Sequence, residues 1–164
     1  MGDEAGVILS FIQSVIHKVR RFFLPRFEVY TDGSVKNGRG SWAYVIVRRD
    51  RVLREASGTH LRPTSNQMEF QAAIEALSSL PENSRIELYT DSRVLIETLQ
   101  KVPEWKVLGW VKSRGQPIPQ VSQLKQLDQL LAVRDVQLKW VKAHSGIKHN
   151  ERCDVLCIQA RSGS

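Results

Sequence analysis

Four carboxylates and one histidine are the residues of this 164-residue chain whose types and positions could support catalysis: Asp32, Glu69, Asp91, Asp154 and His144. Asp32 and Asp91 end two nearly identical segments, Glu-Val-Tyr-Thr-Asp and Glu-Leu-Tyr-Thr-Asp, each of which is typical of a strand. If the two strands are neighbours, their carboxylates leave the sheet at the same edge and raise each other's pKa unless a cation lies between them. Oxygen-only ligation favours Mg²⁺ or Mn²⁺ over zinc.

Each of these residues also has a simpler interpretation when it is taken alone. An Asp at the end of a strand usually caps a turn or a helix. Glu69 lies in the first turns of an expected helix, where a carboxylate commonly interacts with the helix dipole. Asp154, one turn into the last expected helix, could simply be solvated, and His144 could be an ordinary loop histidine. The surrounding sequence has to decide between the two interpretations.

The elements that would position these residues follow from hydrophobic periodicity and turn residues. Thr64 and Gln67 form the pattern of a capping box, which starts a helix. The turn after the first strand is placed at Asp32-Gly33-Ser34. A meander of strands, followed by alternating helices and strands, predicts an α/β fold with a mixed sheet and helices on its faces. We expect strands over 26–32, 41–48, 51–58, 85–90 and 136–141, and helices over 65–80, 92–100, 121–133 and from about 150.

Residues 1–25 differ from the rest of the chain. Apolar residues recur at helical spacing from Val7 onward, basic residues fall mostly between them, and Pro25 ends the segment. We therefore expect an N-terminal amphipathic helical extension over 1–25 and a catalytic domain over 26–164.

The apolar stripe of this extension must be buried against something. Its own domain or a second copy of the chain would serve, and so would a membrane surface, which the basic residues Lys18, Arg20 and Arg21 favour. A mitochondrial-type presequence is the third interpretation, and Asp3 and Glu4 disfavour it.

Composition and charge limit the function classes. Hydrophobic residues make up 41% and charged residues 25% of the chain, which is typical of a globular protein and not of a disordered or membrane-spanning one. The formal net charge of +7 favours a polyanionic partner. Cys153 and Cys157 lie four residues apart on an expected helix, which is no disulfide framework and indicates a reducing compartment. We expect an intracellular, cytoplasmic protein, with organelle or membrane association through the N-terminal helix left open.

Five short segments occur in order along the chain: Tyr-Thr-Asp-Gly-Ser (30–34), Thr-Ser-Asn-Gln-Met-Glu (64–69), Tyr-Thr-Asp-Ser (89–92), Trp-Val-Lys-Ala-His-Ser-Gly (140–146) and Asn-Glu-Arg-Cys-Asp (150–154). Taken together, they resemble the type 1 ribonuclease H family over residues 26–160. The resemblance implies a ribonuclease H-like fold, a five-stranded mixed sheet flanked by helices. It also implies that Asp32, Glu69, Asp91 and Asp154 hold two Mg²⁺ ions, for which Mn²⁺ substitutes, and that His144 assists proton transfer or product release.

The same resemblance implies the reaction and the substrate. Members of the family cut the RNA strand of RNA–DNA hybrids with two metal ions, giving 5′-phosphate and 3′-hydroxyl ends, and we expect this endonuclease activity with no organic cofactor. Asn37, Ser65 and Asn66 match positions that contact the RNA sugar, which distinguishes RNA from DNA. Arg62 and Thr64 match positions that bind a DNA-strand phosphate. Helix capping and loop solvation are the competing explanations for these residues.

Residues 105–114 interleave tryptophans with basic residues and resemble the basic protrusion of cellular members of the family. We expect Trp105, Trp110 and Lys112 to take part in substrate binding, with one tryptophan packed inside and the other facing the groove. The competing interpretation is that both tryptophans belong to the local core.

Two alternative functions remain beside the stand-alone enzyme. The chain could be the ribonuclease H domain of a reverse transcriptase or mobile element, or it could be a catalytically weak hybrid-binding module. A binding module would be expected to have lost a carboxylate, and this sequence retains all four.

Overall fold

The computed structural model describes residues 4–163, with the side chains of residues 6–15 and 23–163. Helices and strands follow the order that the sequence predicts. They are α1 (Glu4–Phe23), β1 (Arg26–Lys36), β2 (Arg39–Arg48), β3 (Arg51–Leu61), α2 (Ser65–Ser78), β4 (Arg85–Thr90), α3 (Arg93–Val107), the 3₁₀ turn η1 (Ser113–Gly115), α4 (Val121–Ala132), β5 (Asp135–Trp140) and α5 (Lys148–Ser162).

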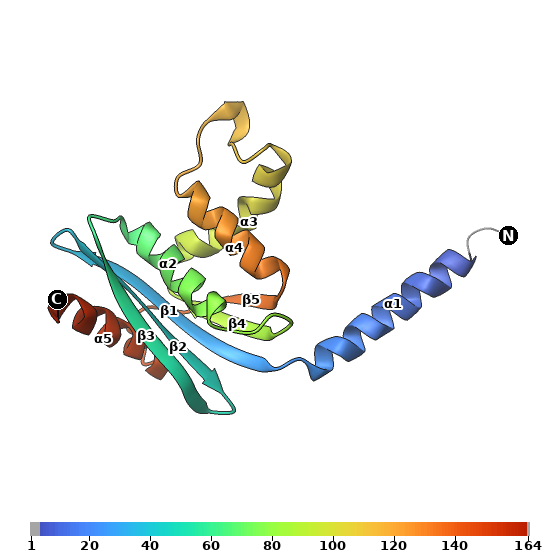
Figure 1. The fold of residues 1–164 in the computed structure, drawn as a ribbon, viewed down its shortest axis with the longest axis horizontal. Helices are drawn as coiled ribbons and strands as arrows, with labels where there is room; N and C mark the ends of the chain where they lie inside the picture. Colours follow the sequence, from blue (N-terminus) through green and yellow to red (C-terminus); the bar gives the residue numbers. More distant parts are fainter. Residues whose placement is uncertain (1–3, 164) are drawn as a thin grey trace.

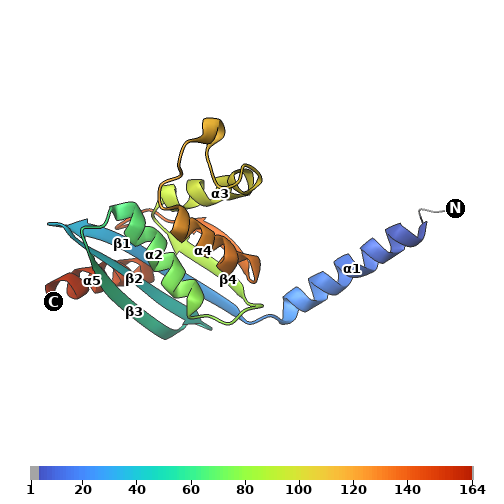
Figure 2. The same ribbon diagram turned by 45° about the horizontal axis from the view of Figure 1, so that its top comes forward.

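The five strands form one mixed sheet in the order β3-β2-β1-β4-β5. β1, β2 and β3 are an antiparallel meander, whereas β4 pairs with β1, and β5 with β4, in parallel. Helices α2, α3 and α4 cover one face of the sheet and α5 covers the other (Figures 1 and 2). The predicted α/β architecture, a five-stranded mixed sheet flanked by helices, is therefore confirmed.

The first turn of the domain lies elsewhere than the sequence predicted. β1 does not stop at Asp32-Gly33-Ser34 but continues to Lys36, and its residues from Gly33 onward pair with the start of β2. The chain folds back at Asn37 and Gly38, which have φ angles of 52° and 73°. Two successive left-handed residues make the hairpin turn whose twist matches that of the flanking strands. Asp32 thus lies within a strand rather than at the end of one.

Helix α3 also extends beyond its predicted end near Gln100. It continues through Pro103 to Val107. Val102 and Trp105 are buried in the core on the α2 face of the sheet. This packing compensates for the backbone hydrogen bond that Pro103 cannot make, which is why the proline does not end the helix.

The predicted N-terminal helix is present as α1 and projects away from the sheet (Figure 1). The side chains described for it, those of residues 6–15, are all exposed. Within the described part of the chain, no helix combines the length and the apolar character needed to cross a bilayer. The extension is therefore an amphipathic helix, and the apolar side chains described for residues 6–15 do not join the core of the domain.

Candidate active site

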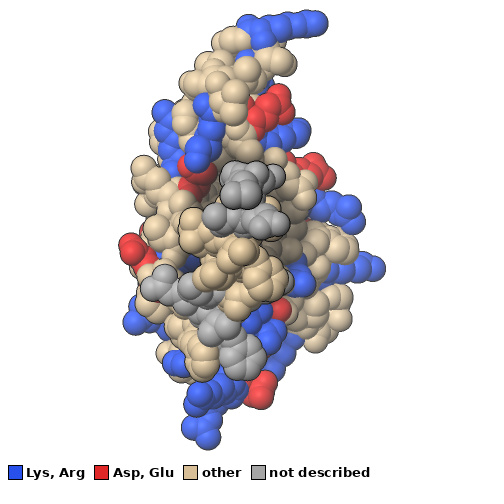
Figure 3. Space-filling model, turned by 90° about the vertical axis from the view of Figure 1, so that its right-hand side faces the viewer, with Lys and Arg blue, Asp and Glu red and all other residues tan. Residues whose placement is uncertain are grey.

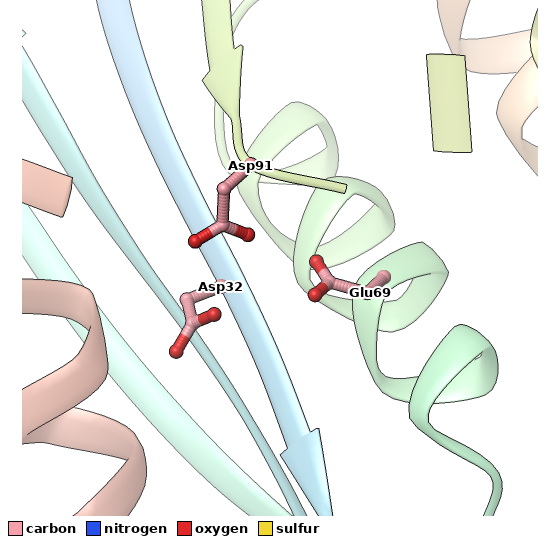
Figure 4. Close-up of side chains that lie close together, drawn as sticks. All are labelled: Asp32, Glu69 and Asp91. Atoms are coloured by element: carbon pink, nitrogen blue, oxygen red, sulfur yellow. The ribbon is translucent and has the colours of Figure 1, made fainter. Parts of the chain in front are cut away.

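Three carboxylates from three different elements converge at one place on the sheet. Asp32 comes from β1, Asp91 directly follows β4, and Glu69 comes from the second turn of α2. Each offers an oxygen, and these oxygens all lie within 4.8 Å of one another. Figure 4 shows the three side chains pointing toward one another. Of the sequence-predicted acidic residues, these three form a common site.

The pairing of β1 with β4 brings the two aspartates together. The strands are parallel neighbours, and Thr31 lies opposite Thr90 in their register. Asp32 and Asp91 are the next residue on each strand. β4 ends at Thr90 while β1 continues, so the two carboxylates meet where the parallel pairing stops, as the repeated segments predicted.

Glu69 reaches this site because α2 lies very close to β1. A Cβ atom on Gly33 would collide with the backbone of Met68 and Glu69, so only glycine at this position allows the approach. α2 itself starts with the predicted capping box: the Thr64 hydroxyl accepts from the Gln67 N–H (3.2 Å), and the Gln67 Oε1 accepts from the Thr64 N–H (2.7 Å). Glu69 is buried beyond the first turn, which excludes the simple helix-dipole role.

The electrostatics of the site call for a cation. Burial, followed by the charges of Asp91 and Asp154, raises the pKa of Asp32 to about 6. Burial and the charges of Asp32 and Asp91 likewise raise the pKa of Glu69 well above its ordinary value. Glu69 Oε2 is buried and finds no hydrogen-bond partner among the described residues. A hard divalent cation would satisfy this oxygen and offset the repulsion, so the residues present fit the metal that the family requires.

Asp154 lies beside this group but outside it. It is half-buried on α5, and its charge contributes to the raised pKa of Asp32. The three-carboxylate group therefore has a fourth acidic neighbour on the side of the sheet that α5 covers (Figure 1). That Asp154 binds a metal together with the other three carboxylates therefore stays a prediction.

A ladder of polar contacts holds α5 against the catalytic strand β1. One contact forms per helical turn and meets every second strand residue, because four helical residues rise about 6 Å and two strand residues about 6.6 Å. Asp154 directly follows the first contacting residue, so the ladder sets its position relative to Asp32. The contacts are Cys153 Sγ to the Tyr30 carbonyl oxygen (3.3 Å), Cys157 Sγ to the Asp32 carbonyl oxygen (3.6 Å) and Arg161 Nη1 to Ser34 Oγ.

Both cysteines are free and buried, as expected of residues that form no disulfide. Burial raises the pKa of Cys157 to about 12 and raises that of Cys153 as well. The two groups therefore remain thiols that donate hydrogen bonds at neutral pH. Their spacing of four residues was visible in the sequence, but the partner carbonyls on β1 were not.

Asn150 is a site residue that the analysis of the sequence did not single out. It is buried at the start of α5, and its Nδ2 donates to Asp91 Oδ2 (3.5 Å). Its Oδ1 has no hydrogen-bond partner among the described residues. An asparagine near the start of a helix has many ordinary roles, such as capping. The one feature of the sequence that pointed to Asn150 was therefore its place in the last segment that resembles the family.

His144 lies on the loop between β5 and α5, as predicted, and is exposed. Its φ of 52° is left-handed, and Gly146 follows with a φ of 83°. The loop is tied to its neighbours by two hydrogen bonds, Ser145 Oγ to the Lys142 carbonyl (2.6 Å) and the Gly146 N–H to Glu151 Oε1 (2.9 Å). The structure thus places His144 outside the carboxylate group, on a surface loop that leads into α5.

The residues predicted to contact the RNA sugar and the DNA phosphate lie at the surface near the turn between β1 and β2. The Arg62 N–H donates to the Gly38 carbonyl (2.8 Å), which ties the end of β3 to the hairpin turn. Arg62 also lines a cavity of about 250 Å³ together with His60 and Gln123. The exposed members of the predicted set are Asn37, Arg62, Thr64, Ser65 and Asn66.

The predicted protrusion is only partly a surface feature. Trp105 is 8% exposed and belongs to the core, so its expected contact with substrate is wrong. Its apolar ring contributes more when it is packed between α3 and its neighbours than at a wet groove. Trp110 is half-buried against the same core with Lys125 Nζ 5.5 Å from its ring centre, and Lys112 is half-buried. Substrate contact by Trp110 and Lys112 stays a prediction.

Comparisons with known proteins agree with this architecture. Residues 25–162 match the family model described as RNase H. A ribonuclease H of Pseudoalteromonas atlantica is 38% identical over 142 residues, which are 85% of this chain and 93% of that protein. The crystal structure of LC9-RNase H1, a type 1 RNase H with the type 2 active-site motif, aligns with a TM-score of 0.74 at 24% identity, covering 85% of this chain and 74% of the other. The foamy viral protease-reverse transcriptase in complex with RNA/DNA hybrid aligns with a TM-score of 0.72 at 14% identity, covering 88% and 21%.

Proposed function

Because this chain belongs to the ribonuclease H family, we propose that it is a metal-dependent endonuclease that hydrolyses the RNA strand of RNA–DNA hybrids. The observation that carries the proposal is the convergence of Asp32, Glu69 and Asp91, with an unpartnered buried oxygen on Glu69. A buried group of anions is costly unless it binds a cation, so a chain without this activity would have no use for it. This argues against a hybrid-binding module without catalysis.

The proposed metal is Mg²⁺, with two ions held by Asp32, Glu69, Asp91 and Asp154, and with Mn²⁺ as a substitute. Two such ions supply the charge that activates water and stabilises the scissile phosphate, which leaves 5′-phosphate and 3′-hydroxyl ends. The chain itself orients the ligands: Asn150 donates to Asp91, and Cys157 donates to the strand at Asp32. No side-chain nucleophile is needed, and the two cysteines are unsuited to that role because they are buried thiols.

Hybrid binding is assigned to the exposed residues around the tip of the meander. The hairpin turn carries Asn37, and the start of α2 carries Ser65 and Asn66, which are the groups proposed to recognise the RNA sugar. Arg62 and Thr64 are proposed to bind a phosphate of the DNA strand. The backbone hydrogen bond from Arg62 to Gly38 ties the hairpin turn to the segment that leads into α2. The net charge of +7 supports a polyanionic substrate.

The test of the proposal is cleavage of an end-labelled RNA–DNA hybrid. The protein should cut the RNA strand internally in Mg²⁺ and not in EDTA, and should leave the DNA strand intact. Duplex DNA of the same sequence, incubated in parallel, is the substrate control. Cleavage that persists in EDTA, or that is equally fast on duplex DNA, would contradict the proposal.

His144→Ala should slow turnover by roughly 100-fold without abolishing it, because a positioned proton carrier contributes about this much while the carboxylate site remains. Steady-state and single-turnover rates on the same hybrid would be measured in Mg²⁺. A loss confined to the steady state indicates a role in product release, and a loss in both indicates proton transfer. An unchanged rate in both experiments would show that His144 is an ordinary loop histidine.

A further inference from the structure

Over residues 6–15, helix α1 presents apolar side chains around about half of its circumference. At about 100° per residue, Val7 and Leu9 lie about 200° apart, and the other apolar residues fall between them on one side of the helix. Ser10 and Gln13 occupy the opposite side, and Ser14 borders the apolar arc beside Val7. The apolar side chains are between 42% and 69% exposed: Val7, Ile8, Leu9, Phe11, Ile12 and Val15. Exposed apolar surface of this extent on one helix indicates a binding surface.

The charges of the sequence are distributed unevenly along this segment. No charged residue occurs between Ala5 and Ile16. Three basic residues, Lys18, Arg20 and Arg21, follow before Pro25 and the start of the domain. Apart from Glu4 at its outer end, the helix is therefore uncharged as far as Ile16 and basic where it joins β1.

The end of the sheet from which α1 emerges is basic as well. The turn between β2 and β3 carries Arg48, Arg49 and Arg51, all exposed, with Asp50 as the single acidic residue among them. Arg26 at the start of β1 is also exposed, although it pairs with Glu87 (2.9 Å). Seen from the side of α1, Lys and Arg side chains predominate over Asp and Glu (Figure 3).

The helix and this basic end form one continuous feature. A cavity of about 450 Å³ lies at their junction, and its lining includes Phe23 and Pro25 from the connection and Arg48 and Arg49 from the turn. The apolar helix therefore adjoins the arginines of the β2–β3 turn, which form a basic rim. An apolar surface beside a basic one matches an anionic lipid surface, with its hydrocarbon interior and its charged headgroups.

We propose that α1 binds flat on an anionic membrane surface, with its apolar side in the lipid interface and the rim formed by Arg48, Arg49 and Arg51 against the headgroups. A second copy of the chain explains the feature less well. A partner helix covers a narrow seam, so it would leave much of an arc of about 200° in water. A lipid surface covers the whole arc, and its negative charge attracts the basic rim.

This orientation leaves the carboxylate group accessible. β1 begins beside the membrane at Arg26, and Asp32 lies six strand residues further along, about 20 Å away at about 3.3 Å per residue. The three carboxylates therefore lie away from the rim, and a nucleic acid can bind them while α1 stays on the membrane. Membrane binding itself does not depend on the proposed nuclease function.

The test is co-sedimentation of the full chain with vesicles of phosphatidylcholine alone and of phosphatidylcholine mixed with phosphatidylglycerol. The wild-type chain should bind the anionic vesicles much more tightly. Phe11→Gln should weaken this binding at least about tenfold, since it removes one large apolar contact. The matched control Ser10→Gln, on the opposite side of α1, should leave it unchanged. Arg49→Gln combined with Arg51→Gln should weaken binding to anionic vesicles about fivefold for each charge.

Hybrid cleavage by each variant shows that the domain is folded, because none of the four substituted residues belongs to the proposed active site. Light scattering without lipid measures the mass of the same proteins. A wild-type dimer that Phe11→Gln converts to a monomer, with no vesicle binding, would assign α1 to a second copy and overturn the proposal. Equal losses for Phe11→Gln and Ser10→Gln, or equal binding to neutral and anionic vesicles, would overturn it as well.

Discussion

Asp32→Asn, Glu69→Gln and Asp91→Asn are each expected to reduce hybrid cleavage by at least about 100-fold, the effect of removing one well-placed electrostatic group from an active site. Each change removes a charge at the point where three carboxylates converge and alters the side-chain volume little. Affinity for the hybrid should stay within a few-fold, because the residues assigned to substrate binding are untouched. Single-turnover cleavage in Mg²⁺ and hybrid binding in EDTA measure the two quantities separately.

Asp128→Asn is a matched control for this prediction. It also replaces an aspartate, but Asp128 pairs with Lys106 on the side of α4 (2.9 Å) and takes no part in the carboxylate group. Its cleavage rate should equal that of the wild type. If any one of the three site variants retained near-normal turnover, the assignment of that residue to the metal site would be wrong. Asp154→Asn should be at least as harmful as His144→Ala, since Asp154 is assigned to the same metal site.

The second large effect concerns the stability of the metal-free protein. In the unfolded chain Asp32 has its ordinary pKa of 3.8, whereas in the folded chain the pKa is about 6. Below pH 3.8 the carboxyl is protonated in both states and does not lower the free energy of unfolding. As the pH rises through 6, the folded state has to carry a buried charge among other anions, so stability is lost. The cost approaches about 3 kcal/mol at neutral pH, from about 1.4 kcal/mol for each pKa unit.

Asp32→Asn should therefore raise the unfolding temperature in EDTA at pH 7 by several degrees, and the gain should disappear near pH 4. Glu69→Gln should behave in the same way, since the pKa of Glu69 is also raised. Mg²⁺ should stabilise the wild type at pH 7, because an ion that binds only the folded state shifts unfolding by mass action. The same addition should stabilise Asp32→Asn much less.

Thermal unfolding at pH 4 and pH 7, with EDTA or Mg²⁺, measures all of these effects in one series. Asp128→Asn serves again as the control and should follow the wild type in every condition. A variant Asp32→Asn that is less stable than the wild type in EDTA at pH 7 would show that the site is not under electrostatic strain. A wild type unaffected by Mg²⁺ would contradict metal binding at these carboxylates.

Local sequence patterns were sufficient for most of the elements and for the choice of catalytic residues. Apolar periodicity predicted α1 and the alternation of helices and strands, and the pair Thr64 and Gln67 predicted the start of α2. The repeated Tyr-Thr-Asp segments predicted that Asp32 and Asp91 would meet, which the parallel pairing of β1 and β4 confirms. These features depend on neighbours a few residues away, so the sequence states them directly.

Other features depended on partners distant in the chain, and only the tertiary structure decided them. The turn lies at Asn37-Gly38 because β1 finds pairing partners on β2 beyond Asp32. Trp105 is buried because α3 packs against a core drawn from most of the chain, which no local pattern distinguishes from a basic surface groove.

How closely the carboxylates of the active site approach one another also depended on residues distant in the chain. Gly33 lets the backbone of α2 approach β1, and the contacts of Cys153 and Cys157 with β1 place Asp154 beside the other carboxylates. The sequence by itself determined which residues could bind a metal and which segments could form each element. The tertiary structure decided which of them share one site, because the distance between two side chains is set by how their elements pack and not by their separation along the chain.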